Sequence, residues 1–190
     1  MKKIGVLGLQ GAISKHINKL NKIEGVLPSI AKYKKDIELL DALIIPGGES
    51  TTIGKLLREY NLIQPLIDRI SSGMPVWGTC AGMILLAKNI CNDSSRHLEV
   101  MDIEVMRNGY GKQLDSFTTS VDLPIISPNK IPLVFIRAPY VVAVAPQVEV
   151  LLRVNGNIVA CRENNMLATS FHPELTEDLS FHIYFVEMIK

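Results

Sequence analysis

A short segment in the first half of the chain has the pattern of a nucleophile elbow. Gly78-Thr79-Cys80-Ala81-Gly82 follows a predicted strand and precedes a predicted helix. The two glycines allow the sharp backbone turn that presents Cys80, and amide groups opening the next helix stabilise a thiolate. The same pentapeptide is equally typical of a buried cysteine in a tight turn, so alone it leaves both interpretations open.

A cysteine nucleophile needs a general base, and the base needs an orienting partner. His172-Pro173-Glu174 supplies both residue types, and in an extended segment residues two apart point to the same side. His16, His97 and His182 have no acid two positions downstream, so the spacing favours His172 with Glu174. A lone His-x-Glu is otherwise typical of a structural histidine.

A third segment, Pro46-Gly47-Gly48-Glu49-Ser50-Thr51-Thr52, ends a predicted strand with paired glycines and hydroxyl residues. Such a turn presents backbone N–H groups to an anion. An ordinary helix N-cap at Ser50 or Thr51 explains the hydroxyls but not the glycines. Neither P-loop nor dinucleotide-binding spacing occurs, and no Cys/His cluster has zinc-ligand spacing.

Short strands and helices alternate over the first ninety residues, which predicts βαβ units and a parallel sheet covered on both faces. Strands are expected at 4–9, 41–46 and 75–78, and helices at 12–23, 51–60, 62–71 and from 83 to 88. Lys32, Lys34 and Lys35 are expected in a solvated loop.

Closely spaced strand patterns dominate the second half, at 98–106, 117–121, 131–137, 140–145, 148–154 and 157–161. Asn155-Gly156 predicts a hairpin turn, and 176–189 an amphipathic helix. Together these patterns predict one α/β domain over residues 1–190, in which a mostly parallel mixed sheet lies between two layers of helices.

Composition narrows the functional class. The 190 residues carry a formal net charge of +1 and are 47% hydrophobic, which fits a globular protein without the basic footprint of nucleic-acid binding. Three cysteines are too few for a disulfide scaffold, and the odd number leaves a free thiol. With no apolar run long enough to span a membrane, we expect no membrane association and a cytoplasmic location.

Taken together, the three segments resemble the triad-type, class I glutamine amidotransferases, whose flavodoxin-like fold matches the predicted sheet. More narrowly, further motifs resemble the glutaminase subunits of pyridoxal 5′-phosphate synthase, in the same order along nearly the whole chain. These motifs are Leu9-Gln-Gly-Ala12, Arg107-Asn108, Gln113-Leu-Asp-Ser-Phe117 and Phe135-Ile-Arg-Ala-Pro139. Lys112 stands where that family typically has arginine.

The resemblance implies a role for each candidate residue. Cys80 would attack the glutamine side-chain amide, His172 would transfer protons, and Glu174 would orient His172. Backbone N–H groups near Gly48 and Ala81 would form the oxyanion hole. The glutamine pocket would be lined by Gly48, Glu49, Ser50, Arg107, Ile136 and Arg137. From residue type alone, either arginine is better explained by a surface ion pair.

The resemblance also implies a partner. Ammonia would pass to a separate (β/α)₈ synthase subunit, docked on the face around Gln10, Glu49 and Cys80, and the chain itself would hold no cofactor or metal. Two other functions stay open: a cysteine hydrolase acting on peptides or aldehydes, and a docking subunit without catalysis. The joint presence of Cys80, His172 and Glu174 disfavours the docking subunit.

Overall fold

The computed structural model describes residues 1–110 and 116–190; Lys112 and Gln113 lie outside the described residues. Its strands are β1 (Lys2–Leu7), β2 (Val26–Ala31), β3 (Ala42–Ile45), β4 (Val76–Thr79), β5 (Ala87–Ile90), β6 (Met101–Met106), β7 (Ser116–Val121), β8 (Ile131–Ile136), β9 (Tyr140–Val144), β10 (Glu149–Val154), β11 (Asn157–Glu163) and β12 (Met166–Thr169). Its helices are α1 (Ile13–Leu20), α2 (Lys34–Glu38), α3 (Ser50–Glu59), α4 (Ile63–Ser71), α5 (Ala81–Leu86) and α6 (Ser180–Glu187), with a 3₁₀ turn η1 (Pro173–Leu175).

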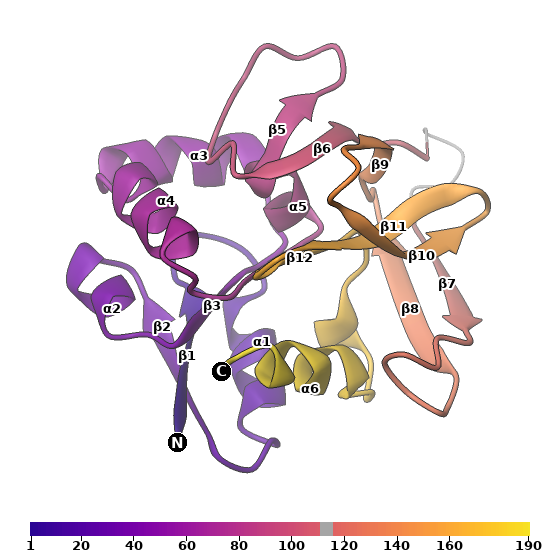
Figure 1. The fold of residues 1–190 in the computed structure, drawn as a ribbon, viewed down its shortest axis with the longest axis horizontal. Helices are drawn as coiled ribbons and strands as arrows, with labels where there is room; N and C mark the ends of the chain where they lie inside the picture. The colour runs from indigo at the N-terminus through magenta and orange to yellow at the C-terminus, as the bar shows by residue number, and fades with distance from the viewer. Residues whose placement is uncertain (111–115) are drawn as a thin grey trace.

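One large sheet forms the middle layer, in the order β2-β1-β3-β4-β12-β11-β9-β6-β5, with β10 also paired to β11 (Figure 1). The strands from β2 to β12 are parallel, and β12, β11, β9 and β6 pair antiparallel in succession. The prediction of a mostly parallel mixed sheet in an α/β fold is therefore confirmed.

Alternating side chains explain why both faces of the sheet are covered. In β3, Leu43 and Ile45 join the hydrophobic cluster that includes α3, α4 and α5, whereas Ala42 and Ile44 join the cluster that includes α1 and α6. Period-two alternation sends neighbouring residues to opposite faces, so a strand with apolar residues throughout must be buried on both. The β7–β8 hairpin packs on the α1 and α6 side, through residues such as Phe135 (Figure 1).

Several expected elements differ in the structure. The helix expected from residue 83 begins at Ala81 and ends at Leu86, after which the chain continues as β5. The amphipathic helix expected over 176–189 is the shorter α6, whose buried residues Phe181, His182, Phe185 and Val186 share one face, while Ile183 is exposed. Two of the three clustered lysines, Lys34 and Lys35, are exposed on α2 instead of in a loop.

Other features were predicted closely. Asn155 and Gly156 both have positive φ, 51° and 83°, and connect β10 to β11 as the predicted hairpin turn. No helix in the described ranges is long and apolar enough to cross a membrane.

Candidate active site

The carboxyl ends of the parallel strands lie at the same edge of the sheet, and the candidate residues follow these ends. Gln10 comes after β1, Gly47 after β3, Cys80 after β4 and His172 after β12. In sheets of this kind ligands bind at the carboxyl ends of the strands. The topology therefore brings four distant segments to one place.

Cys80 occupies a strained backbone position between β4 and α5. Its φ is 50° and its ψ is −105°, a conformation that residues with a Cβ rarely adopt. The flanking glycines are required by close approach: a Cβ on Gly78 would lie 2.4 Å from the Gly82 carbonyl, and one on Gly82 would lie 2.2 Å from the Ile45 carbonyl oxygen. The predicted nucleophile elbow is thus present as a tight turn.

His172 and Glu174 are joined by a short hydrogen bond. Nδ1 of His172 lies 2.7 Å from Oε1 of Glu174, and the Glu174 side chain is fully buried. The extended conformation expected for this segment is wrong, because the chain turns at Pro173 into η1. The turn still brings the carboxylate beneath the imidazole, so the predicted pairing is found with a different backbone.

The imidazole also lies beside the nucleophile. A Cβ placed on Gly47 would be 2.6 Å from Cε1 of His172 and 3.3 Å from Cβ of Cys80, so these three residues are immediate neighbours. Burial lowers the pKa of His172, but Cys80 and Glu174 outweigh it and raise that pKa to about 10. His172 is therefore an imidazolium at neutral pH, directly beside Cys80.

Glu174 stays ionised despite its burial. Burial alone raises the pKa of this carboxyl, while the hydrogen bond from His172 and the proximity of His16 lower it below its ordinary value. An ionised carboxylate on Nδ1 fixes the tautomer and orientation of His172.

A cavity of about 360 Å³ opens on this arrangement and collects almost every candidate residue. It is bordered by Cys80 and His172 and by the predicted set of Gly48, Glu49, Ser50, Ala81, Arg107, Ile136 and Arg137. Glu174 does not line it, because this residue lies behind His172. Five further lining residues were not among the predicted site residues: Gln10, Gly47, Ile84, Asn108 and Pro139.

The missed residues had a signal in the sequence, with one exception. Gly47, Asn108 and Pro139 belong to the motifs that carried the resemblance, and Gln10 was assigned to the docking face. Ile84 lies one helical turn after Cys80, which places it on the same side of α5.

The two arginines are held differently. Nη1 of Arg107 donates to Oδ2 of Asp93 at 2.9 Å, and hydrogen bonds from Ser95 and Arg107 lower the pKa of Asp93 to about 2. Arg137 has a positive φ of 42° and an exposed guanidinium 3.8 Å from Glu49. Arg107 is thus fixed by its ion pair, while Arg137 stays largely in solvent.

The glycine-rich loop is held from several sides. The Gly47 N–H donates to Oγ1 of Thr79 at 3.1 Å, and the Gly47 carbonyl accepts from the Ala12 N–H. The Glu49 N–H donates to Oε1 of Gln10 at 2.9 Å. Helix α3 begins at Ser50, and neither hydroxyl caps it, so the N-cap explanation for this segment is wrong.

The remaining cysteines are poorly suited to catalysis. Burial raises the pKa of Cys161 to about 12, and burial together with Glu104 raises the pKa of Cys91. Across residues 1–110 and 116–190, no three His, Cys, Asp or Glu side chains are grouped to hold a metal ion.

Comparison with known proteins identifies the family of the chain. The chain is 73% identical to a protein of Ruminiclostridium cellulolyticum named pyridoxal 5′-phosphate synthase subunit PdxT, covering 100% of both chains. It is 52% identical to a protein of the same name from Clostridium botulinum, covering 98% of this chain and 97% of the other. A crystal structure described as a glutamine amidotransferase superimposes with a TM-score of 0.92 at 41% identity, covering 98% of each chain. Residues 6–190 match the model of the SNO glutamine amidotransferase family, and the chain therefore belongs to that family.

Proposed function

We propose that this chain is a glutaminase that hydrolyses L-glutamine to L-glutamate and ammonia through a thioester on Cys80. The observation that carries the proposal is the meeting of Cys80 with the His172–Glu174 pair at one cavity. Membership of a glutamine amidotransferase family supports the choice of substrate. A hydrolase acting on peptides or aldehydes would use the same nucleophile but gains no such support.

Each member of the triad has a defined task in this reaction. The Cys80 thiolate attacks the side-chain amide carbon, and the carbonyl oxygen becomes an oxyanion stabilised by backbone N–H groups of Gly48 and Ala81. His172, protonated at rest, gives its proton to the departing ammonia, and Glu174 holds the imidazolium in place. Water, deprotonated by His172, then attacks the thioester and releases glutamate.

The cavity suits a small zwitterionic amino acid. The substrate would be bound by Gly48, Glu49, Ser50, Arg107, Ile136 and Arg137, all of which border the cavity. A guanidinium presents a planar fork to a carboxylate. Arg107 is the better-placed fork because Asp93 already fixes it, whereas Arg137 closes the pocket beside Glu49.

We further propose that the ammonia is delivered to a (β/α)₈ synthase subunit for pyridoxal 5′-phosphate synthesis. The names of the relatives support this partner. The docking face would surround Gln10, Glu49 and the Cys80 elbow, where the cavity opens. Cofactor chemistry would belong to the synthase subunit, so this chain would bind neither the cofactor nor a metal.

Two broader expectations belong to the same proposal. Residues 1–190 would act as one glutaminase domain, since both hydrophobic clusters pack on the same sheet. The chain would work in the cytoplasm, because Cys80 must remain a free thiol and reducing compartments keep it so.

The deciding experiment is ammonia release from glutamine by the purified chain, alone and with a barrel-type synthase subunit. We expect release that depends on Cys80 and rises when the synthase subunit is added. Cys80→Ala is the control; its residual rate should stay below about one per cent of wild type, in line with loss of a nucleophile. Cys161→Ala, a buried cysteine away from the cavity, should keep the wild-type rate.

Two results would overturn the proposal. Release that survives Cys80→Ala would remove the nucleophile. A folded wild-type chain that releases no ammonia, with or without the synthase subunit, would leave another hydrolase or a docking protein.

A further inference from the structure

Behind the triad lies a second pair of buried histidines that the reaction above does not use. His16 on α1 and His182 on α6 are both fully buried, although the sequence separates them by 166 positions. Nδ1 of His16 lies 3.0 Å from Nε2 of His182. Both rings pack edge-on against the indole of Trp77, with centroid separations of 5.9 and 5.0 Å. The pair is therefore fixed in position by the core.

This pair reaches the side of the catalytic carboxylate that His172 leaves free. Oε1 of Glu174 accepts from His172, whereas Oε2 is buried without a hydrogen bond of ordinary geometry among the described residues. Nε2 of His16 lies 3.4 Å from that oxygen, at the long end of hydrogen-bond range, and 3.3 Å from Oγ1 of Thr79, its hydrogen-bond partner in the structure. A buried carboxylate oxygen without a donor is costly, so His16 supplies the nearest compensation.

The contacts of His16 favour one arrangement of hydrogens. A carboxylate only accepts, so Oε2 gains a donor from His16 only in the tautomer that carries the hydrogen on Nε2, where the same hydrogen also meets Oγ1 of Thr79. Nδ1 of a neutral His16 then accepts, and the hydrogen on Nε2 of His182 is the donor that meets it. Burial lowers the pKa of His16 to about 4 and lowers the pKa of His182 well below its usual value, so both rings stay neutral at pH 7. Nδ1 of His182, which has no partner in the described structure, is left as a bare lone pair.

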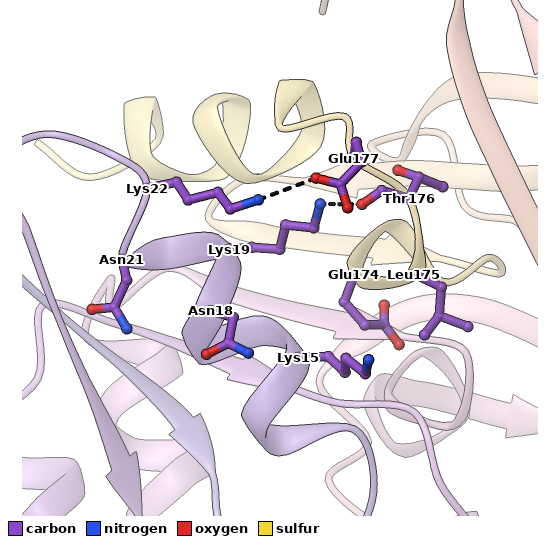
Figure 2. A pocket seen from close by; sticks show the side chains of 9 residues that line it. All are labelled: Lys15, Asn18, Lys19, Asn21, Lys22, Glu174, Leu175, Thr176 and Glu177. Carbon is purple, nitrogen blue, oxygen red and sulfur yellow. Dashed lines mark hydrogen bonds and ion pairs between the residues drawn. The ribbon is translucent and has the colours of Figure 1, made fainter.

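Side chains on and just after α1 also contact the turn that carries Glu174. Figure 2 shows lysines of α1 directed at the segment that follows Glu174, across a cavity of about 480 Å³. Nζ of Lys19 donates to the Thr176 carbonyl, and Nζ of Lys22 lies 3.2 Å from Glu177. Lys19 on α1 and Lys22 just after it thus contact the Glu174 turn from outside, and His16 contacts it from inside.

We propose that His16 is a positioning residue of the glutaminase reaction, whose Nε2–H holds the second oxygen of Glu174 while His182 keeps His16 in the required tautomer. This inference rests on the triad proposed above. With both oxygens held, Glu174 cannot rotate away from His172, and the imidazole keeps the orientation that faces Cys80. His16 does not line the glutamine cavity and reaches its wall only indirectly, through the Thr79 hydroxyl that accepts the Gly47 N–H, so its loss should affect proton transfer more than glutamine binding.

The test compares two substitutions of His16 in glutamine hydrolysis by the full chain with its synthase subunit. His16→Leu removes the donor and keeps an apolar side chain in the core. His16→Gln places an amide N–H near the position of Nε2. For His16→Leu we expect kcat to fall about tenfold to a hundredfold, as small misplacements of catalytic groups do, while KM for glutamine changes less than about twofold. For His16→Gln we expect most of kcat to return.

Two further readouts separate positioning from loss of stability. In His16→Leu the basic limb of the kcat–pH profile should move to lower pH, because a loosened Glu174 stabilises the His172 cation less. Phe185→Leu removes packing against the same indole, with no polar contact to the triad. That control should lower the melting temperature and leave kcat near wild type. If His16→Leu does not fold, the His182 variants provide the test instead: His182→Gln should have a higher kcat than His182→Leu.

The inference is wrong if His16→Leu matches Phe185→Leu in kcat, or if glutamine and leucine at position 16 lower kcat equally with the basic limb unmoved. If His16→Leu does not fold, equal kcat values for His182→Gln and His182→Leu refute the inference. Cys80→Ala keeps the two proposals separate: ammonia release without Cys80 refutes the glutaminase itself. Cys80-dependent release with normal kcat in the His16 variants refutes only the positioning role.

Discussion

Thr79 Oγ1 accepts the Gly47 N–H at 3.1 Å, so the residue before the nucleophile holds the loop whose Gly47 and Gly48 line the cavity beside Cys80. Thr79 is the last residue of β4, and Gly47 follows the neighbouring parallel strand β3, whose register with β4 pairs Ile45 with Gly78. The hydrogen bond therefore fixes the Gly47-Gly48 backbone relative to Cys80.

We predict that Thr79→Val lowers kcat for glutamine hydrolysis about tenfold and destabilises the fold by about 1–3 kcal/mol, because a buried N–H loses its acceptor. Thr79→Ser keeps the hydroxyl and should retain most of both. Steady-state kinetics and denaturant unfolding measure the two effects. Wild-type kcat in a folded Thr79→Val would show that this loop needs no such support.

The strained backbone at Cys80 leads to a prediction about stability. A residue at φ 50° and ψ −105° stores about 1–3 kcal/mol of strain, which glycine does not have. The greater freedom of glycine in the unfolded chain cancels about 0.5–1 kcal/mol of that gain. Cys80→Gly should therefore melt above Cys80→Ala, by about 2–4 °C for each kcal/mol of net gain, and both should be inactive.

The neighbouring helix supplies the control for that comparison. Ala81→Gly lies one residue further, where the backbone is helical, and there glycine should lower the melting temperature. A Cys80→Gly chain that melts below Cys80→Ala would mean that the elbow stores no strain.

The sequence predicted the site where the signal is local. The elbow at Cys80 and the loop at Gly47 each depend on glycines beside a buried strand, and such turns are specified by a few adjacent residues. The strand β2 was not predicted, because Pro28 interrupts its pattern; as an edge strand it tolerates a proline. The central strand β12 is only four residues long and gives too short a pattern to recognise.

Contacts between residues far apart in the chain could not be predicted from the sequence. Two histidines in separate helical patterns gave no indication that they meet behind Glu174, since α1 and α6 are brought together only by packing on the sheet. The pairing of His172 with Glu174 was predicted from extended geometry, yet η1 produces it. The residue types and their spacing predicted the pair but not the backbone conformation that forms it.

The raised pKa of His172 predicts a wide pH range for activity. The His172 side chain must be protonated to give a proton to the departing ammonia. In the free enzyme kcat/KM should therefore fall only as the pH approaches about 10. Glu174→Gln removes one of the charges that stabilise this cation. The variant should keep a measurable but much reduced rate, with its basic limb at lower pH. An unshifted limb at the wild-type rate would exclude Glu174 from the triad.

The buried His16 predicts how stability depends on pH. Its pKa is 6.5 when exposed and about 4 in the fold, so between these values the unfolded chain binds a proton that the folded chain does not. Stability must then fall as the pH drops from 6.5 towards 4, by up to roughly 3 kcal/mol for this one group. His182, whose pKa is also lowered, acts in the same direction.

The other members of the network do not cancel this slope. The pKa of His172 is raised, so its contribution is complete below pH 6.5 and is lost only as the pH rises through about 10. The pKa of Glu174 is lowered, so its contribution is present above 4.5 and is lost at lower pH. Between pH 4.5 and 6.5 the main difference between wild type and a His16 variant is therefore the proton that His16 binds only in the unfolded chain.

We predict that His16→Gln flattens the loss of stability over this range, since glutamine has no proton to bind. Urea unfolding at half-unit steps from pH 4.5 to 7 measures the slope, and the wild-type slope should exceed that of His16→Gln by up to about 1.4 kcal/mol per pH unit. His97, which keeps its own lowered pKa in both proteins, contributes equally to each and drops out of the difference. Parallel curves would mean that His16 takes up a proton in the folded protein as readily as in the unfolded chain, and the neutral donor facing Glu174 would then have to be abandoned.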